Sequence, residues 1–201
     1  MKRAWVLLET GRLVLRRFTE DDAQNLFDLD SDPEVMRYLN GGTPTPRGVI
    51  EADILPRFSR YDERSPCFGV WAADERATGE FIGWFSFRPL DDSDPVEVAL
   101  GFRLRRSSWG QGYATEGARA LIHLGFGELG VQRGVATTYE ENLASRRVME
   151  KAGMTLAQTF RMTREELARV DTYDVGAQDL WDGNDVEYAL LRSDWEAQEG
   201  Q

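Results

Sequence analysis

The 201-residue sequence is poor in cysteine and histidine and contains one of each, Cys67 and His123. One cysteine excludes a disulfide within the chain, and these two residues supply too few ligands for a dedicated zinc site. The sequence also lacks the run of about 18 apolar residues that a membrane-spanning helix needs. Its apolar start, residues 4–8, is too short for a secretory signal and runs into Glu9 and Arg12. We therefore expect a reduced, cytoplasmic protein with no metal and no membrane partner.

Basic residues are also scarce, since 24 Lys and Arg face 35 Asp and Glu and give a net charge of −11. This acidity disfavours a nucleic-acid partner, because such binding depends on neutralising phosphates. The charge is uneven: residues 163–201 carry a net −8, whereas residues 101–120 carry four arginines, one glutamate and a net +3. A basic segment among glycines predicts an anion site. The alternative is a solvated acidic tail with solubilising arginines at a strand edge.

The length is ample for one hydrophobic core, and the 41% hydrophobic content with six Trp and ten Phe indicates a globular chain. No repeat, linker or low-complexity run divides the sequence, so we expect a single domain over residues 1–201. Hydrophobic patterning predicts helices at 19–27, 45–64, 113–126 and 142–152, and strands at 13–18, 68–72, 80–87, 96–104, 135–139, 156–162 and 186–191. This order predicts a mixed α/β sheet, antiparallel in part, with one parallel crossover.

The most informative segment is residues 104–116 (LRRSSWGQGYATE), where a predicted strand ends, glycines turn the chain and a helix begins. Free backbone amides and the helix dipole at such a start favour an anion, and glycine allows close approach to the backbone. The alternative is a tight turn without a ligand. The segment is not a P-loop, which needs Gly-Lys-Ser/Thr, and Thr115 replaces the third glycine of a dinucleotide fingerprint. The literal G-x-G-x-x-G at 125–130 follows a predicted helix, so we interpret it as a helix end.

Residues 107–116 (SSWGQGYATE) resemble motif A of the GNAT N-acetyltransferases, and residues 142–154 (NLASRRVMEKAGM) resemble their motif B. The two motifs lie about 30 residues apart with a predicted strand between them, a combination more specific than either alone. Their detailed form is similar to the RimJ/RimL branch, which acetylates N-terminal amines of ribosomal proteins. Residues 10–16 (TGRLVLR) and 185–190 (DVEYAL) also fit, and the resemblance is weakest over 161–184.

The resemblance implies a GNAT-like fold of about seven mostly antiparallel strands, with a central splayed parallel pair and flanking helices. It implies acetyl-CoA as the cosubstrate and no metal. The pyrophosphate would lie on the amides from Trp109 to Ala114, and the pantetheine arm would pair with the strand that ends near Phe102 and Leu104. The implied CoA-binding residues are Phe102, Arg103, Leu104, Arg105, Trp109, Gly110, Gln111, Gly112, Tyr113, Ala114, Asn142 and Ser145.

Amide formation from a thioester requires that the amine lose a proton, that the oxyanion be stabilised and that the thiolate gain a proton. We expect Glu97 to be the catalytic base. It lies on the strand at 96–104, where alternation places it opposite Val96 and Val98. An ordinary exposed strand glutamate is the alternative, and Glu140 and Glu141 are further candidates, although acids there also favour a helix dipole.

Many GNAT enzymes carry a tyrosine acid in motif B, but the aligned residue here is Met149, which cannot donate a proton. Ser145 is the expected substitute, with its hydroxyl near the CoA sulfur or, alternatively, bonded to its own helix backbone. Asn142 fits both an N-cap and a contact with pantetheine.

Motif A often has Gln or Arg where this sequence has Ser107, and either Arg105 or Arg106 is expected to supply that charge. Trp181 lies within the acidic stretch and fits a pocket for a cationic amine or a simple loop anchor.

These observations predict an N-acetyltransferase that moves an acetyl group from acetyl-CoA directly to a primary amine. Transfer through a cysteine is not expected, because Cys67 has no histidine near it in the sequence. The acceptor remains open between a protein N-terminal amine and a small-molecule amine. The alternative is a non-catalytic acyl-CoA-binding module or sensor, which Met149 and Ser107 favour. Since dimers are common among similar proteins, the resemblance also leaves a homodimer open.

Overall fold

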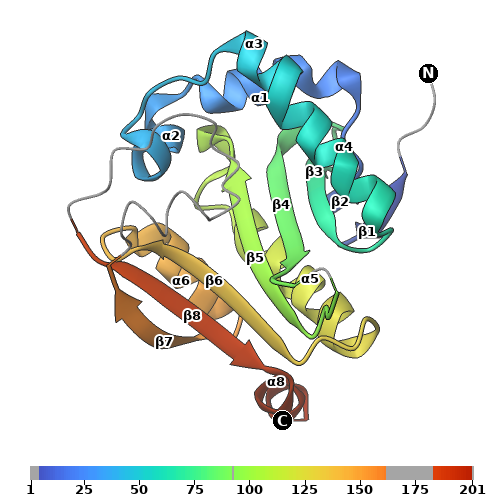
Figure 1. Ribbon diagram of the computed structural model, residues 1–201, viewed down its shortest axis with the longest axis vertical. Helices are drawn as coiled ribbons and strands as arrows, with labels where there is room; N and C mark the ends of the chain where they lie inside the picture. The colour runs from blue at the N-terminus through green and yellow to red at the C-terminus, as the bar shows by residue number, and fades with distance from the viewer. Residues whose placement is uncertain (1–4, 92, 162–182, 201) are drawn as a thin grey trace.

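The computed structural model describes residues 5–91, 93–161 and 183–200. In this part of the chain the strands form one eight-stranded sheet in the order β1-β2-β3-β4-β5-β6-β8-β7 (Figure 1). Neighbouring strands are antiparallel throughout, except for the parallel pair β5 and β6. The strands are β1 (Val6–Glu9), β2 (Leu13–Arg16), β3 (Gly69–Glu75), β4 (Phe81–Pro89), β5 (Glu97–Leu104), β6 (Arg133–Tyr139), β7 (Thr155–Phe160) and β8 (Asp185–Leu191).

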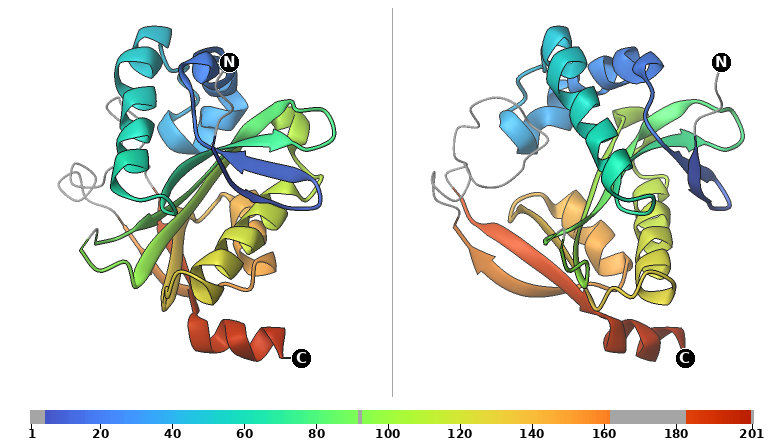
Figure 2. Two further views of the ribbon diagram at one scale, coloured as in Figure 1. Left: turned by 90° about the vertical axis from the view of Figure 1, so that its right-hand side faces the viewer. Right: turned by 45° about the vertical axis from the view of Figure 1, so that its right-hand side comes forward.

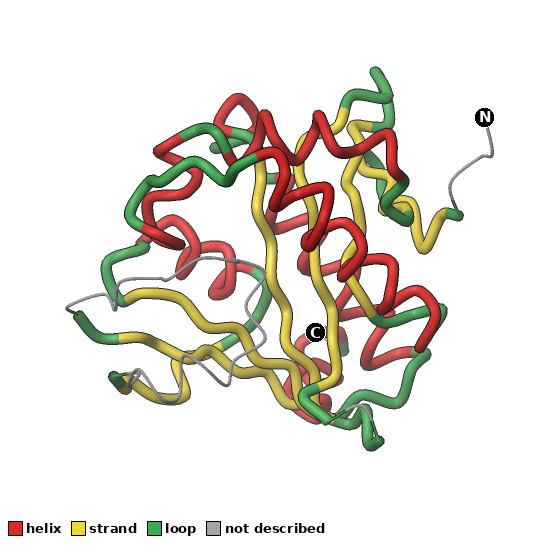
Figure 3. Tube along the Cα trace, turned by 45° about the horizontal axis from the view of Figure 1, so that its top comes forward, coloured by secondary structure: helices red, strands yellow, loops and turns green. Residues whose placement is uncertain are grey.

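The helices lie on both faces of the sheet (Figures 2 and 3). They are α1 (Ala23–Asp30), α2 (Pro33–Asn40), α3 (Arg47–Val49), α4 (Leu55–Arg64), α5 (Tyr113–Gly127), α6 (Leu143–Lys151) and α8 (Arg192–Glu199). A π-helical turn (Ile50–Ile54) joins α3 to α4 without a break. Among the described helices, none combines the length and the apolar character required to cross a bilayer.

Two hydrophobic cores result from the alternation of side chains along the strands. In β3, Trp71 and Ala73 belong to the core beneath α5 and α6, whereas Val70 and Ala72 belong to the core beneath α1 and α4. Figure 2 shows these helix groups on opposite sides of the sheet. A strand buried on both faces reads as a continuous apolar run rather than an alternating one, which explains the sequence of β3.

The predicted fold class is confirmed, and each of the seven predicted strands is present. The sheet has eight described strands rather than about seven, because the short strand β1 at the edge was not predicted. The helices α2 and α8 were also not predicted. The start of α2 has a recognisable signal, since Asp32 accepts a hydrogen bond from the Glu34 amide and Pro33 is the first helical residue.

The predicted splay of the parallel pair is confirmed by the strand register. Only Glu97–Ala99 of β5 pair with β6, at residues 133–135. Beyond this point β5 continues to Leu104 along β4, and β6 continues to Tyr139 along β8. One edge of β5 is therefore left without a described strand partner near its carboxyl end.

The helix α5 sits close against β4 because two of its residues are glycines. A Cβ at Gly117 would lie within 2.7 Å of three ring atoms of Phe85, and a Cβ at Gly125 would lie 2.5 Å from the Phe87 ring. These approaches fix the position of α5, and hence of its first turn, relative to the sheet.

We predict that Gly117→Ala lowers the free energy of unfolding by about 1–3 kcal/mol, because the added methyl overlaps the Phe85 ring in a packed core. Urea unfolding followed by circular dichroism measures this change. Gly127→Ala on the same helix is the matched control, since a Cβ there would meet only Trp195, at 3.9 Å. Equal stability of the two variants would contradict the close packing of α5.

Candidate functional site

The loop between β5 and α5 has a backbone that requires glycine at two positions. After Leu104 the chain makes a 3-10 turn (Arg106–Ser108) and reaches α5 through Gly110 and Gly112. Gly110 has φ +74° and Gly112 has φ +84°, in the left-handed region that disfavours side chains. A Cβ added at Gly110 would meet no atom within 4 Å, so the loop faces open space there.

The start of α5 presents backbone amides to that space. The amide of Glu116 donates to the carbonyl of Gly112 at 3.0 Å, which is the first bond of the helix. Helix geometry leaves the amides of residues 113–115 without an acceptor inside the helix, and the cap residue Gly112 has no side chain to accept from them. Such an arrangement favours an anionic ligand at a helix start.

The edge of β5 that faces away from β4 leads directly to this loop. The carbonyl of Val96 faces β6, where it accepts from the Gln132 amide at 2.7 Å, whereas the amide of Arg105 faces β4. Because successive residues of a strand direct their backbone groups to opposite edges, the N–H and C=O of Phe102 point to the side from which β6 has diverged. An extended ligand with amide groups could pair with Phe102 there.

The indole of Trp109 marks the end of this edge. Its Nε1 donates to the carbonyl of Leu104 at 2.8 Å, while 46% of the residue's surface remains exposed. The backbone edge and the glycine loop are thus joined by a direct contact.

The four arginines of the predicted basic segment are not gathered at the loop. Arg103 is buried and pairs with Asp30 of α1 at 2.8 Å. Arg119 donates to the carbonyl of Lys151 at the end of α6. The expectation of one basic patch is therefore corrected, because strand alternation and helix position send these side chains to different partners.

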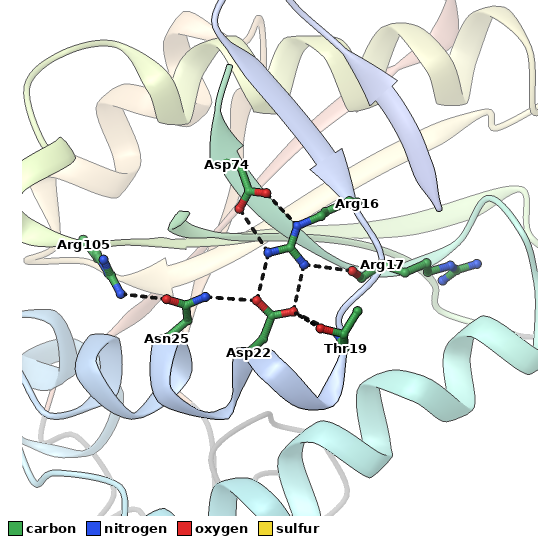
Figure 4. A network of polar contacts seen from close by, with 7 residues as sticks. All are labelled: Arg16, Arg17, Thr19, Asp22, Asn25, Asp74 and Arg105. Atoms are coloured by element: carbon green, nitrogen blue, oxygen red, sulfur yellow. Dashed lines mark hydrogen bonds and ion pairs between the residues drawn. The ribbon is translucent and has the colours of Figure 1, made fainter. Parts of the chain in front are cut away.

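Arg105 is directed to α1 by a network of polar contacts (Figure 4). Its Nη2 donates to Oδ1 of Asn25 at 3.2 Å, and Asn25 donates to Asp22. Asp22 accepts two hydrogen bonds of 2.8 Å from Arg16, which also pairs with Asp74 at 2.6 Å. Burial opposes the charge of Asp22, but the bonds from Arg16 and its other donors hold the pKa of Asp22 below its ordinary value. Arg105 is thus held away from the loop by an ionic network.

Arg106 makes no ion pair with any described residue, and it lies in the 3-10 turn that precedes the glycines. Ser107 is exposed, and its carbonyl accepts from Nε2 of Gln111 at 2.8 Å. Of the two arginines that the sequence left open, Arg106 is the one with a guanidinium available for an anion.

Glu97 lies at the closed end of the β5–β6 pair. Its carboxylate forms a close ion pair with Arg133, whose Nη2 contacts Oε1 of Glu187 at 2.7 Å. The bond to Glu97, with a further one to Glu187, raises the pKa of the Arg133 guanidinium. Val98 is fully buried while Glu97 is half-buried, so the two side chains lie on opposite faces as the alternation predicted.

The two other candidate carboxylates precede α6. Oε2 of Glu140 accepts from Nδ2 of Asn184 at 2.9 Å and so links the end of β6 to the start of β8. The carbonyl of Glu141 accepts from the hydroxyl of Tyr38 on α2 at 3.4 Å. Both glutamates are exposed.

The first turn of α6 carries the other predicted residues. Asn142 is the N-cap, since its Oδ1 accepts from the Ser145 amide at 3.2 Å and its Nδ2 donates to Oγ1 of Thr138 at 3.1 Å. The hydroxyl of Ser145 makes no hydrogen bond to any described residue, so it is not bonded to its own helix backbone. Met149 is 2% exposed and belongs to the core beneath α5 and α6.

Trp181 and most of the acidic segment lie in residues 162–182, outside the described part of the chain. Sequence reasoning missed the contact of Arg12 with Glu116 and with the carbonyl of Gln111. These residues are about 100 positions apart in the chain, and no local pattern connects them.

Comparison with known proteins identifies relatives of this chain. A family sequence model described as an acetyltransferase (GNAT) domain matches residues 12–155. The chain is 32% identical over 200 residues to the FsC-acetyl coenzyme A-N(2)-transacetylase of Aspergillus fumigatus, a match that covers 96% of this chain and 79% of that protein. It is 33% identical to the uncharacterized protein YkkB of Bacillus subtilis, over 80% of this chain and 92% of that protein.

Solved structures share the same fold. A probable acetyltransferase superposes with a TM-score of 0.74 at 21% identity, covering 95% of this chain and 99% of its own. RimL, a ribosomal L7/L12 alpha-N-protein acetyltransferase in complex with coenzyme A, gives a TM-score of 0.72 at 16% identity, covering 92% and 97%. At these identities the likeness concerns the fold.

Proposed function

The chain belongs to the GNAT acetyltransferase family and is an acetyl-CoA-dependent N-acetyltransferase; on that premise we propose that it transfers the acetyl group directly to a primary amine. The observation that carries this proposal is the continuity between the free edge of β5 at Phe102 and the amides at the start of α5. Acetyl-CoA has both parts that such a site needs, an amide-bearing arm and a pyrophosphate.

The residues at the loop fit this cosubstrate. The open space at Gly110 would receive phosphate oxygens, which a Cβ would exclude. The Trp109 amide already donates to the carbonyl of Arg106 at 3.1 Å, so the amides of residues 110–114 would hold the pyrophosphate. Phe102 would pair with the pantetheine arm. We propose Arg106, rather than Arg105, as the cation beside the phosphates, because Arg105 is engaged by Asn25.

In the proposed reaction the amine nitrogen attacks the thioester carbonyl, a C–N bond forms, and the C–S bond breaks with release of the CoA thiol. A primary alkyl amine is mostly protonated at neutral pH, so a base must first remove a proton from it. We propose Glu97 as that base, with Glu140 and Glu141 as the alternatives. Ser145 would protonate the departing sulfur, a role supported by its hydroxyl, which accepts no hydrogen bond from, and donates none to, the described residues.

For the acceptor we favour a small-molecule amine over a protein N-terminus. The relative that is 32% identical over nearly the whole chain is named FsC-acetyl coenzyme A-N(2)-transacetylase, a name that mentions no protein acceptor. The likeness to RimL is at 16% identity and supports the fold alone. An acceptor screen of amines and N-terminal peptides, with products identified by mass spectrometry, distinguishes these classes. Tight CoA binding without turnover on any amine would instead favour a non-catalytic acyl-CoA-binding module or sensor.

We predict that Gly110→Glu abolishes CoA binding measured by calorimetry, because a carboxylate would fill the phosphate site and repel its charge. Gly79→Glu is the matched control: Gly79 has the same φ of +74° and equally open surroundings, but it lies in the turn between β3 and β4. The control variant is expected to suffer the same backbone strain and to keep its affinity for CoA. Undiminished affinity in Gly110→Glu would rule out the phosphate site.

We predict that Glu97→Gln slows acetyl transfer by about 10²-fold at pH 7 and by less at pH 9.5, where more of the amine is already neutral. Release of free thiol at both pH values measures the effect. Glu187→Gln removes the other carboxylate bound to Arg133 and is expected to leave the pH profile unchanged. An equal loss at both pH values would assign Glu97 a positioning role instead.

A further inference from the structure

The turn between β1 and β2 packs against the glycine loop through one side chain, Arg12. Its Nη1 donates to the carbonyl of Gln111 at 2.9 Å. Its Nε and Nη2 contact Oε2 of Glu116 at 2.6 and 2.5 Å. The planar guanidinium thus joins the loop to the first turn of α5 in a fixed fork.

The bond to Gln111 determines which way the next amide points. A trans peptide is planar, and its C=O and N–H point in opposite directions. Since the Gln111 carbonyl is directed to Arg12, the N–H of Gly112 lies in the same peptide plane and is directed away from Arg12. That amide is the one that precedes the free amides of α5.

The position of Arg12 itself is fixed on several sides. Its guanidinium carbon lies 4.6 Å above the ring of Tyr113, whose hydroxyl forms a close hydrogen bond with Glu75 at the end of β3. A Cβ at Gly112 would lie 3.4 Å from Nη2 of Arg12, so this side of the glycine is already filled. The stacking and the fork restrain the Arg12 side chain, of which 48% is exposed.

The charge of Arg12 is balanced within this cluster. Oε1 of Glu116 accepts from Oγ1 of Thr10 at 2.6 Å and from the Arg12 amide at 2.9 Å. Burial disfavours the charged form of Glu116, but the hydrogen bonds from Thr10 and Arg12 outweigh it and hold its pKa below the ordinary value. Glu116 therefore stays ionised at neutral pH, and Arg12 is not a free cation for a phosphate.

We infer that Arg12 is a positioning residue for the acyl donor: by holding the Gln111 carbonyl, it turns the Gly112 amide toward the pyrophosphate of acetyl-CoA. This inference rests on the proposed function, because it assumes that the loop binds CoA. By this inference the turn of residues 10–12 contributes to the affinity for acetyl-CoA, although it takes no part in the acetyl transfer itself.

The main test compares Arg12→Ala with the wild type. Loss of the hydrogen bond from the Gly112 amide to a charged phosphate is expected to raise the Kd for CoA at least about tenfold. Calorimetry measures this change. The KM for acetyl-CoA should rise in step, while kcat at saturating acetyl-CoA stays within about threefold of the wild-type value. A wild type that binds no CoA would overturn the proposed function; equal Kd values in both proteins would overturn only the role of Arg12.

Two further variants separate orientation from charge. Arg12→Lys retains the charge but lacks the fork, so we expect it to bind CoA as weakly as Arg12→Ala. The double variant Arg12→Ala with Glu116→Gln removes both charges, and we expect its affinity to remain low. Recovery of wild-type affinity in either protein would overturn the inference and leave charge balance as the explanation.

The salt dependence of the Kd provides an independent readout. If Arg12 contacted a phosphate as a free cation, its removal would flatten the dependence of Kd on ionic strength. Because Arg12 is paired with Glu116, removing both charges leaves the net charge of the site unchanged, so we expect Arg12→Ala with Glu116→Gln to keep the wild-type slope. A flatter slope in this double variant would contradict the assignment.

Arg76→Ala is the matched control for general damage to the turn. Arg76 binds the carbonyl of Thr10 at 3.1 Å and pairs with Glu9 at 3.4 Å, but it does not contact the glycine loop. We expect a similar change in melting temperature and an unchanged Kd for CoA. A Kd raised as far as in Arg12→Ala would show that any loosening of the turn suffices and would overturn the specific role of Arg12.

Discussion

The short parallel pairing of β5 with β6 is the constraint on which the rest of the structure depends. Three residues on each strand pair, and then the two strands follow different partners. Among the described residues no strand pairs with this edge of β5 beyond Ala99. A strand edge without a partner presents unpaired N–H and C=O groups, and we propose that an extended ligand pairs with them inside the sheet rather than at its outer border. The ion pairs of Arg133 with Glu97 and Glu187 lie at the closed end of this divergence and link β5, β6 and β8.

The free edge is useful for binding only if the anion site lies at its end, and the packing of α5 provides this. Gly117 and Gly125 let the helix approach the rings of Phe85 and Phe87. The helix start is thereby held against the strand that neighbours β5, and Arg12 fixes the intervening loop from the opposite side. The proposed donor site consists mainly of backbone groups, and the side chains around them hold that backbone in place.

Local patterns were sufficient to predict the strands, the glycine loop and the long helices, because these follow from periodicity and from the need for glycine at positive φ. The strand β1 was missed because none of its four residues is buried, so its sequence has no alternation between a buried and an exposed face. The helix α8 is short and polar, and its Trp195 packs on Phe126 and His123. Because this contact is tertiary, the local sequence of α8 does not predict the helix.

The partners of the charged residues were the least predictable part of the site. Arg103, Arg105 and Arg106 are neighbours in sequence, yet Arg103 pairs with Asp30, Arg105 reaches Asn25, and Arg106 alone has no ion pair within the described residues. Charge counting along the chain treats them as one patch, whereas the fold separates them by strand face and by distant partners. The same limit applies to Arg12 and Glu116.

The central claim is that acetyl-CoA lies along the free edge of β5 and ends on the amides of the glycine loop. A crystal structure of the protein with CoA tests it most directly. We predict pantetheine amide groups at hydrogen-bond distance, about 2.7–3.2 Å, from the N–H and C=O of Phe102. We also predict pyrophosphate oxygens on the amides between Gly110 and Ala114. A CoA molecule bound elsewhere, or one that leaves the Phe102 backbone unpaired, would contradict the account.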